Sequence, residues 1–164
     1  MAQISGFFGS ALTSIDPKGR MAIPASFRNP IIYGSKGDSV VMFSFNAEAQ
    51  CLQGSGTERV NALVEHMQRR ELTAFENGEN FRTEVVGGPR FTSTFPVTFD
   101  GSGRLILPRM LVALAKIEKQ VFFAGNGSDF SVWGVEHLLG LDDPQLSTQQ
   151  YNAQFLMDEL GAKR

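Results

Sequence analysis

Several residue types are scarce in this chain of 164 residues, and each scarcity narrows what the protein can be. The single cysteine, Cys51, excludes an internal disulfide, fits a reducing cytosol and lies in an apolar context typical of a small core residue. No apolar run approaches the roughly 20 residues that a membrane-spanning helix needs. Residues 1–5 lack a basic segment followed by a long apolar one, so we expect no secretory signal, and we expect residues 1–6 to form a short flexible start.

An excess of positive charge is also absent. The formal net charge is −2, which counts against a generally basic nucleic-acid binder. The charge is unevenly placed, however, because between residues 15 and 35 the cations Lys18, Arg20 and Arg28 face only Asp16. The last third of the chain is acidic, with Asp129, Glu136, Asp142, Asp143, Asp158 and Glu159. The local field, not the whole-chain charge, therefore decides what the surface attracts.

Residues that enzymes use for chemistry are equally sparse. The two histidines, His66 and His137, have no serine or cysteine placed to form a nucleophile pair with them. Two histidines and one cysteine at these spacings do not make a zinc site. The segment 125–127 is Gly-Asn-Gly without a following Lys-Ser or Lys-Thr, so it is typical of a hairpin turn and not of a phosphate loop. We therefore expect no enzyme activity, no metal, no cofactor and no small-molecule substrate.

What the sequence does contain is an internal repeat. Residues 15–24, Ile-Asp-Pro-Lys-Gly-Arg-Met-Ala-Ile-Pro, and residues 99–108, Phe-Asp-Gly-Ser-Gly-Arg-Leu-Ile-Leu-Pro, have the same pattern. Both read apolar-Asp-x-x-Gly-Arg-apolar-x-apolar-Pro, with the second copy 84 residues after the first. A repeat of this kind predicts two copies of one supersecondary unit.

The pattern predicts a strand, a tight turn, a second strand and then proline. Asp16 and Asp100 can accept hydrogen bonds from amides two or three residues on, and Gly19 and Gly103 supply the positive φ that such a turn needs. Each copy thus leaves one arginine, Arg20 or Arg104, beside a rigid turn. Chemistry alone leaves two interpretations open: the arginine either contacts a ligand or only pairs with its own aspartate and braces the turn.

The elements around the two turns recur in the same order. In the first copy we expect strands over residues 7–15, 21–23, 39–45 and 51–53 and a short helix over 25–33; in the second copy we expect strands over 90–99, 105–107, 120–125 and 130–133 and a helix over 109–116. The fourteen phenylalanines fall mostly on strand positions, which predicts core packing and not base stacking.

Helices are expected between and after the copies. Thr57 is a suitable N-cap for a helix ending near Leu72, and a second helical segment, interrupted by Gly78, covers about residues 73–86. The sequence Gly-Gly-Pro at 87–89 predicts a break between the repeats. In the tail, Ser147 can cap a helix whose apolar stripe packs on the body or on a neighbouring subunit.

The paired Asp-x-x-Gly-Arg-x-x-x-Pro units, each followed by a short helix and a strand, resemble the MraZ family of bacterial transcription regulators. Phe8-Gly9 before the first unit, and residues 121–127 leading to 130–133 after the second, agree with it. The resemblance covers about residues 6–138. One copy alone indicates only the wider AbrB/SpoVT-like group; residues 73–89 match poorly, and the tail beyond Leu141 lies outside the resemblance.

The resemblance implies an α+β fold in which two pseudo-symmetric AbrB/SpoVT-like β units form one barrel-like domain, with helices between and after the repeats. The implied division is unit 1 at 7–53, a helical connector at 54–89, unit 2 at 90–138 and a C-terminal tail at 139–164. It also implies a ring-shaped homo-oligomer, cytoplasmic and nucleoid-associated. This ring would bind repeated boxes in double-stranded DNA upstream of the division and cell-wall gene cluster.

Carried over by position, the DNA-facing motif comprises the turn residues Asp16, Gly19, Asp100 and Gly103 and the cations Lys18, Arg20, Arg28 and Arg104. Because Ser102 replaces Lys18 and Val112 replaces Arg28, we expect the second copy to contribute less to DNA binding. The alternative function is a protein-interaction module that binds no DNA and inhibits a cytosolic partner, which the acidic net charge and tail favour.

Overall fold

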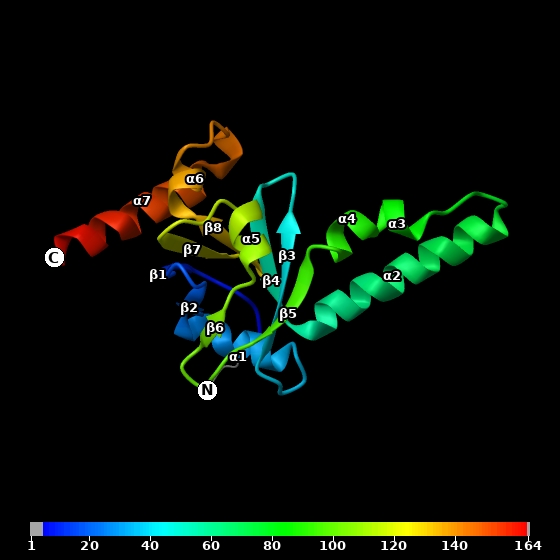
Figure 1. Cartoon of the computed structure of the whole chain (residues 1–164), viewed down its shortest axis with the longest axis horizontal. Coiled ribbons are helices and arrows are strands. Elements are labelled where there is room, and N and C mark those ends of the chain that lie inside the picture. The colour runs from blue at the N-terminus through cyan, green and yellow to red at the C-terminus, as the bar shows by residue number, and fades with distance from the viewer. Residues whose placement is uncertain (1–4, 164) are drawn as a thin grey trace.

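The computed structural model describes residues 5–163, so the expectations for residues 1–6 fall mostly outside it. The architecture is α+β, as predicted: an antiparallel sheet with helices around it. A helical arm leaves the body at one end, and the C-terminal helix leaves it at the other (Figure 1). None of the helices in the described part of the chain is long and apolar enough to cross a membrane.

Within residues 5–163, eight strands form two sheets. They are β1 (Ser10–Ser14), β2 (Arg20–Ala22), β3 (Val40–Asn46), β4 (Cys51–Ser55), β5 (Thr94–Thr98), β6 (Arg104–Ile106), β7 (Gln120–Gly125) and β8 (Phe130–Gly134). Six of them make one sheet in the order β1-β7-β8-β4-β3-β5, while β2 and β6 pair as a separate two-stranded ribbon. The helices are α1 (Ala25–Tyr33), α2 (Thr57–Glu76), α3 (Thr83–Val86), α4 (Gly88–Phe91), α5 (Arg109–Leu114), α6 (Val135–Leu139) and α7 (Ser147–Ala162), with a 3₁₀ turn η1 (Pro144–Leu146).

The two copies of the repeat exchange strands. β1 of the first copy pairs with β7 of the second, and β5 of the second pairs with β3 of the first. The strands on either side of each turn therefore do not form a hairpin with each other, because the turn leads the chain from the six-stranded sheet into the ribbon. Their backbone groups are satisfied by the other copy instead. The two copies share one sheet, and the division of the chain at residues 53, 89 and 138 stays a prediction.

A pseudo-twofold axis relates the copies. In the ribbon Met21 pairs with Leu105, its own counterpart 84 residues later. In the centre of the sheet Gln53 pairs with Ser131, and both hold the same place in their copies. The strand order is also symmetric, since β1, β7 and β8 correspond to β5, β3 and β4. The axis thus passes through both self-pairs, and the ribbon lies on it.

The barrel-like closure that the resemblance implied is not confirmed. Within residues 5–163, β1 and β5 lie at the two edges of the six-stranded sheet, and no strand pairing joins them. The ribbon does not bridge these edges either, because β2 and β6 pair only with each other. The fold is therefore an open antiparallel sheet with a separate ribbon.

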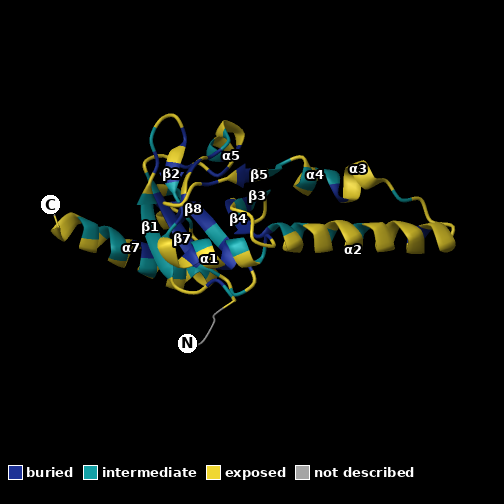
Figure 2. Ribbon diagram, turned by 90° about the horizontal axis from the view of Figure 1, so that it is seen from below, coloured by how far each residue is buried: buried dark blue, intermediate teal, exposed yellow. Residues whose placement is uncertain are grey.

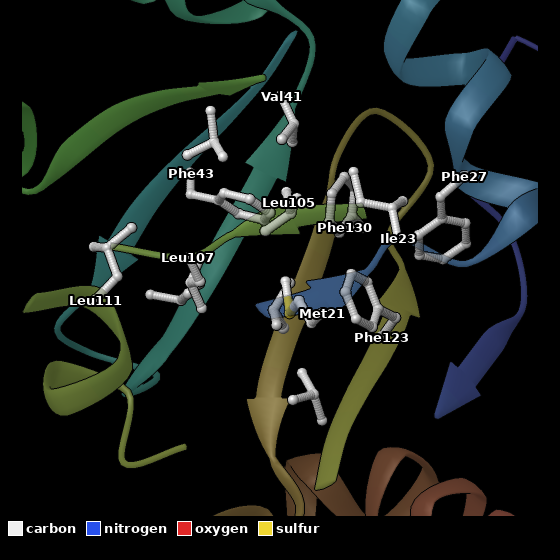
Figure 3. Close-up of a cluster of buried hydrophobic side chains, with 14 of the residues drawn as sticks. Met21, Ile23, Phe27, Val41, Phe43, Leu105, Leu107, Leu111, Phe123 and Phe130 are labelled. Carbon is white, nitrogen blue, oxygen red and sulfur yellow. The ribbon is translucent and has the colours of Figure 1, made fainter. Parts of the chain in front are cut away.

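The core lies between the sheet, the ribbon and helices α1 and α5. Figure 3 shows Met21 and Leu105 from the ribbon among side chains from the sheet and both helices. Phe130 is fully buried at its centre, with its ring centroid 4.9 Å from that of Phe7 and 5.2 Å from that of Phe27. The prediction that the phenylalanines pack in the core is confirmed for these residues.

A second, smaller cluster joins the sheet to the C-terminal helix. Cys51, Trp133 and Ala153 are buried in it, so the prediction that Cys51 is a core residue is confirmed. Gln150 ties α7 to α6 by donating from Nε2 to the carbonyls of Leu138 and Leu141 at 2.9 and 2.7 Å. The tail therefore packs on the body through part of its apolar stripe, which was one of the two roles expected for it.

The connector differs from its prediction in four places. Gly56, and not Thr57, holds the N-cap position of α2, and no side chain caps the helix. α2 continues past Leu72 to Glu76 and ends only where Gly78 adopts a positive φ of 69°. The Gly-Gly-Pro segment ends α3 at Gly87, but a helix resumes at once in α4, because proline is tolerated in the first turn of a helix, where its missing N–H has no partner in any case. β5 consequently starts at Thr94 and not at residue 90. Most of α2 is exposed, as Figure 2 shows.

The start of the C-terminal helix also differs in detail. α7 begins at Ser147, but the Ser147 side chain makes no capping bond. Asp143 acts one turn earlier, where its carboxylate accepts from the amide of Gln145 at 3.0 Å and caps η1. The residues after the last strand form α6, a helix that the sequence analysis did not assign.

Replacing Phe130 with alanine should destabilise the protein by about 3–5 kcal/mol, because it removes a fully buried ring that four other rings surround. Equilibrium unfolding in urea measures the loss. The control is Phe8→Ala, since Phe8 is exposed and its loss should cost less than about 0.5 kcal/mol. Equal losses for the two variants would show that the rings around Phe130 are not the centre of the core.

Candidate functional site

The first turn is built around the carboxylate of Asp16. Its Oδ1 accepts from the amides of Lys18 and Arg20, both at 2.9 Å, and its Oδ2 accepts from Nε of Arg20. The backbone closes the same turn, with the Gly19 amide donating to the Asp16 carbonyl at 2.9 Å. The predicted turn is therefore present, and Asp16 fixes both the backbone and the arginine that follows it.

The second turn repeats this geometry. Oδ1 of Asp100 accepts from the amides of Ser102 and Arg104 at 2.9 Å, and Oδ2 accepts from Nε of Arg104 at 2.8 Å. The Gly103 amide donates to the Asp100 carbonyl at 2.9 Å. Two turns of different sequence, Pro-Lys and Gly-Ser, thus hold their arginines in the same way.

These bonds favour the charged form of both carboxylates. The Arg20 amide, followed by the Arg20 side chain, lowers the pKa of Asp16 below its usual 3.8, and the Arg104 amide and side chain do the same for the pKa of Asp100. A lowered folded-state pKa means that the unfolded chain binds more protons in acid. These turns therefore contribute stability that is complete above about pH 3.8 and is lost as the pH falls below it.

Each turn is also anchored to the opposite copy. The carbonyl of Gly19 accepts from the amide of Leu107, and the carbonyl of Gly103 accepts from the amide of Ile23, both at 2.8 Å. The two glycines have φ values of 85° and 78°, and both approach the other copy closely. A Cβ at Gly19 would lie 2.7 Å from the Leu107 carbonyl oxygen, so only glycine fits there.

Each arginine does pair with its own aspartate, and this pairing leaves half of each guanidinium available for a ligand. Only Nε of Arg20 and Arg104 bonds to an aspartate, and within residues 5–163 neither Nη nitrogen of these arginines has a hydrogen-bond partner. The two side chains are 62% and 74% exposed. Each arginine therefore presents a pair of parallel N–H donors to solvent in a direction that its aspartate holds constant.

Both arginines lie on the outer face of the ribbon. β2 and β6 are antiparallel, with Arg20 opposite Ile106 and Ala22 opposite Arg104. Met21 and Leu105 between them are buried, so the alternation of a strand turns the other four outward. The outer face thus carries one arginine from each copy, related by the pseudo-twofold axis.

Arg28 lies at the second turn and not at the first. Its Nε donates to the carbonyl of Ile23 at 3.0 Å, and a Cβ at Gly103 would lie 2.4 Å from that same Nε. The side chain is half-buried over the turn of the other copy. The expected place of Arg28 beside Lys18 and Arg20 is wrong, because the strand exchange carries α1 across to the Asp100 turn.

Helix α5 lies correspondingly beside the first turn. A hollow of about 400 Å³ separates the two, and Asp16, Gly19, Arg109, Val112 and Lys116 are among the residues that line it. Arg109 and Lys116 were not among the predicted site residues. Arg109 follows Pro108 directly, so its place after the repeat pattern was a signal, but the strand exchange that brings it to the first turn was not readable.

The residues considered for chemistry lie elsewhere. Burial raises the pKa of the Cys51 thiol to about 12, which makes it a poor nucleophile. Desolvation lowers the pKa of His137, and Lys116 adds to the effect. In the part of the chain from residue 5 to 163, no three His, Cys, Asp or Glu side chains gather in a way that could hold a metal ion.

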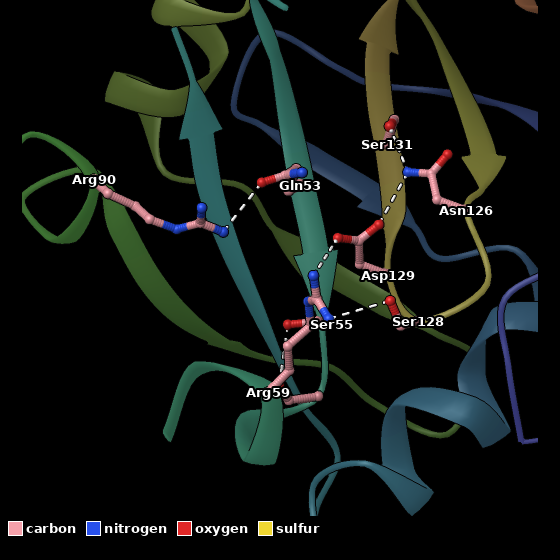
Figure 4. Close-up of polar contacts among 9 residues, drawn as sticks. Gln53, Ser55, Arg59, Arg90, Asn126, Ser128, Asp129 and Ser131 are labelled. Carbon is pink, nitrogen blue, oxygen red and sulfur yellow. Dashed lines mark hydrogen bonds and ion pairs between the residues drawn. The ribbon is translucent and has the colours of Figure 1, made fainter. Parts of the chain in front are cut away.

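A polar network fixes the root of the arm to the sheet. Arg59, in the first turn of α2, contacts Asp129 at 3.2 Å and donates from Nη1 to Oγ of Ser128 at 3.1 Å. Asp129 is almost fully buried and also accepts from Asn126 at 3.0 Å (Figure 4). This pairing sets the direction in which α2 leaves the body.

Comparisons with known proteins agree with the resemblance seen in the sequence. Residues 91–137 match the family described as "MraZ protein, putative antitoxin-like". A transcriptional regulator MraZ of Gluconacetobacter diazotrophicus is 28% identical over 131 residues, which are 79% of each chain. The protein of the same name from Rickettsia bellii is 29% identical over 73% of this chain and 75% of its own, and that from Rickettsia akari is 27% identical over 77% and 80%.

Replacing Asp16 with alanine should lower the melting temperature, because two amides and one guanidinium lose their acceptor. Asp16→Asn should be milder, since its side-chain oxygen can still accept from the amides. Thermal melts between pH 3 and 7 measure both: the wild type should lose stability below about pH 3.8, and the variants should lose less over that window. Asp38→Ala, an exposed change outside the turns, is the control and should follow the wild type.

Proposed function

We propose, from the resemblance to the MraZ family that the comparisons confirm, that this chain is a sequence-specific DNA-binding transcriptional regulator. Its partner is double-stranded DNA carrying repeated boxes upstream of the division and cell-wall gene cluster. It acts in the cytoplasm on the nucleoid as a ring-shaped homo-oligomer and catalyses no reaction. The relatives that carry the name transcriptional regulator support the regulatory role.

One observation carries the proposal: two arginines with free parallel donors stand on the same face of a rigid ribbon. With Nε bonded to aspartate, the Nη1 and Nη2 edges of Arg20 and Arg104 match the N7 and O6 acceptors of guanine in the major groove. The major groove admits a two-stranded ribbon. The aspartates thus serve the arginines by fixing where their donors point, although they bring negative charge to a DNA-facing surface.

Further cations beside the two turns suit phosphate contacts, which position a protein on the duplex. The first turn has Lys18 on it and Arg109 and Lys116 beside it. The second turn has Arg28 beside it and Ser102 in place of the lysine. We therefore propose that both turns approach DNA and that the first contributes more to affinity. The local excess of positive charge agrees with DNA binding despite the net charge of −2.

Exposed apolar side chains at the two ends of the molecule support assembly. On the arm, Phe75 is 82% exposed, and Leu72 and Val85 are also exposed. At the other end, where α7 leaves the body (Figure 1), Tyr151 and Phe155 are exposed. Different surfaces at opposite ends can join head to tail, and such contacts close into rings when the rotation allows. A ring also multiplies the few contacts that one subunit offers to spaced boxes.

The exposed apolar arm also fits the alternative function, a protein-interaction module that binds no DNA and inhibits a cytosolic partner. The salt dependence of DNA binding distinguishes the two candidate functions. A chain that places several cations on phosphates loses DNA affinity steeply as salt rises, because it releases counterions. A module that only binds protein retains no duplex at 50 mM salt and shows no such slope.

Alanine variants of the two arginines test the proposal directly. In an electrophoretic shift with the DNA upstream of the protein's own gene, Arg20→Ala should weaken specific binding by roughly 1–3 kcal/mol per site, since one bidentate base contact is lost. Arg104→Ala should weaken it less, because fewer cations lie near the second turn. The control is Arg82→Ala, an exposed arginine of the arm that pairs with Glu84. Tight binding by a correctly folded Arg20→Ala variant would contradict the assignment of the site.

Assembly can be tested through the arm. The double variant Leu72→Ser with Phe75→Ser should lower the molar mass measured by light scattering, because it removes the apolar surface at the tip of α2 without touching the core. Its DNA affinity should fall with its mass through lost multivalency. Tyr33→Ser, on the exposed surface of the body, serves as the matched control. An unchanged mass in the arm variant would show that subunits do not meet there.

A further inference from the structure

We propose that Ile106 reads the methyl group of a thymine, and that Ile106 and its counterpart Ala22 make the two halves of the DNA site chemically different. This inference rests on the proposed DNA-binding function and names a specificity-determining residue for it. It starts from the four outward positions of the ribbon. Arg20 stands opposite Ile106, and Arg104 stands opposite Ala22.

The pseudo-twofold axis makes these positions comparable in pairs. Arg20 corresponds to Arg104, so both halves of the face carry the same charged group in the same bonding arrangement. Ala22 corresponds to Ile106, 84 residues later, so the halves differ at this pair alone among the four outward positions. One half of the face is arginine with isoleucine, and the other is arginine with alanine.

The Ile106 side chain is exposed to solvent and is not part of the core. It is 63% exposed, whereas its strand neighbours Leu105 and Leu107 are buried. Its Cγ2 lies 3.7 Å from where a Cβ on Gly19 would stand, so it rests beside the backbone of the first turn. At the second turn the guanidinium of Arg28 approaches Gly103 instead. The apolar group thus lies next to the turn that carries Lys18 and Arg20.

The chemistry of the major groove selects the ligand. Among the base edges there, the C5 methyl of thymine is the apolar group, and apolar side chains contact it. Residues directly opposite each other in an antiparallel pair have Cβ atoms about 5 Å apart, and base pairs follow one another every 3.4 Å along the duplex. Arg20 on a guanine therefore places Ile106 over a base pair close to that guanine. Ala22, beside Arg104 in the other half, has a shorter side chain and therefore reaches less far into the groove.

The outer face has room at both halves. A hollow of about 390 Å³ lies between β1 and the ribbon, and its counterpart of about 600 Å³ lies between β5 and the ribbon. The first is lined by Thr13, Ser14 and Ala22 among others, so a larger side chain at position 22 meets open space. The difference between Ala22 and Ile106 is therefore not forced by packing, and either residue can be exchanged without disturbing the core.

The test uses a pool of randomised DNA duplexes enriched by the wild-type protein and, separately, by Arg20→Ala. In the best enriched duplex, each thymine is then replaced in turn by deoxyuridine, which lacks only the C5 methyl. Wild-type affinity should fall about 4-fold per site at one such position, which corresponds to about 0.8 kcal/mol for one buried methyl group. Ile106→Ala should lose this sensitivity, Ile106→Val should keep part of it, and Ala22→Ile should gain a second sensitive position.

The outcomes distinguish a failure of the proposed DNA-binding function from a failure of the role of Ile106. No enrichment by the wild type, or equal enrichment by Arg20→Ala, overturns the proposed function. Specific enrichment that Arg20→Ala abolishes upholds that function. Within that result, affinity that is unchanged by every deoxyuridine, or equal sensitivity in Ile106→Ala and wild type, overturns the role of Ile106. Thermal melts of Ile106→Ala and Ala22→Ile, expected to match the wild type, confirm that any change arises at the DNA.

Discussion

The hydrogen bonds that cross between the two copies hold the rest of the structure in place. They run through the sheet, where β1 meets β7 and β3 meets β5, and through the ribbon, where Met21 meets Leu105. They also join the carbonyl of each turn glycine to the amide of the residue directly before the helix-opening proline of the other copy, which is Leu107 for Gly19 and Ile23 for Gly103. Because each copy completes the other, the turns cannot move independently, and their arginines keep a fixed mutual spacing.

Local structure could be predicted from the sequence wherever the hydrogen bonds of a motif form within the motif itself. The turns at Asp16 and Asp100 are such motifs, since each carboxylate binds amides within four residues of itself. The short helices after Pro24 and Pro108 and the long hydrophobic strands also follow from their own residues. The family resemblance then supplied the link between these turns and DNA, which no residue pattern alone provided.

What could not be read was the partner of each strand. An exchange between copies leaves the alternation of apolar residues unchanged, so Ser10–Ser14 has the same pattern whether it pairs with its own return strand or with β7. Because the strand partners were unknown, Arg28 was predicted at the wrong turn, and Arg109 and Lys116 were not predicted to lie beside the first turn. The barrel-like closure is not confirmed for a related reason, because strand sequences do not state whether the two edges of a sheet meet.

The strand exchange also constrains how the chain can fold as it is synthesised. Ser10 pairs with Ala124, 114 residues further along, so β1 has no partner until most of the chain has left the ribosome. The hairpin of β3 and β4 can form early, but the ribbon and the edges of the sheet must wait for the second copy. Contacts so distant in sequence are slow to form. An interrupted chain that ends before residue 90 would therefore expose unpaired strands, which invite aggregation and give cellular proteases time to remove the incomplete product.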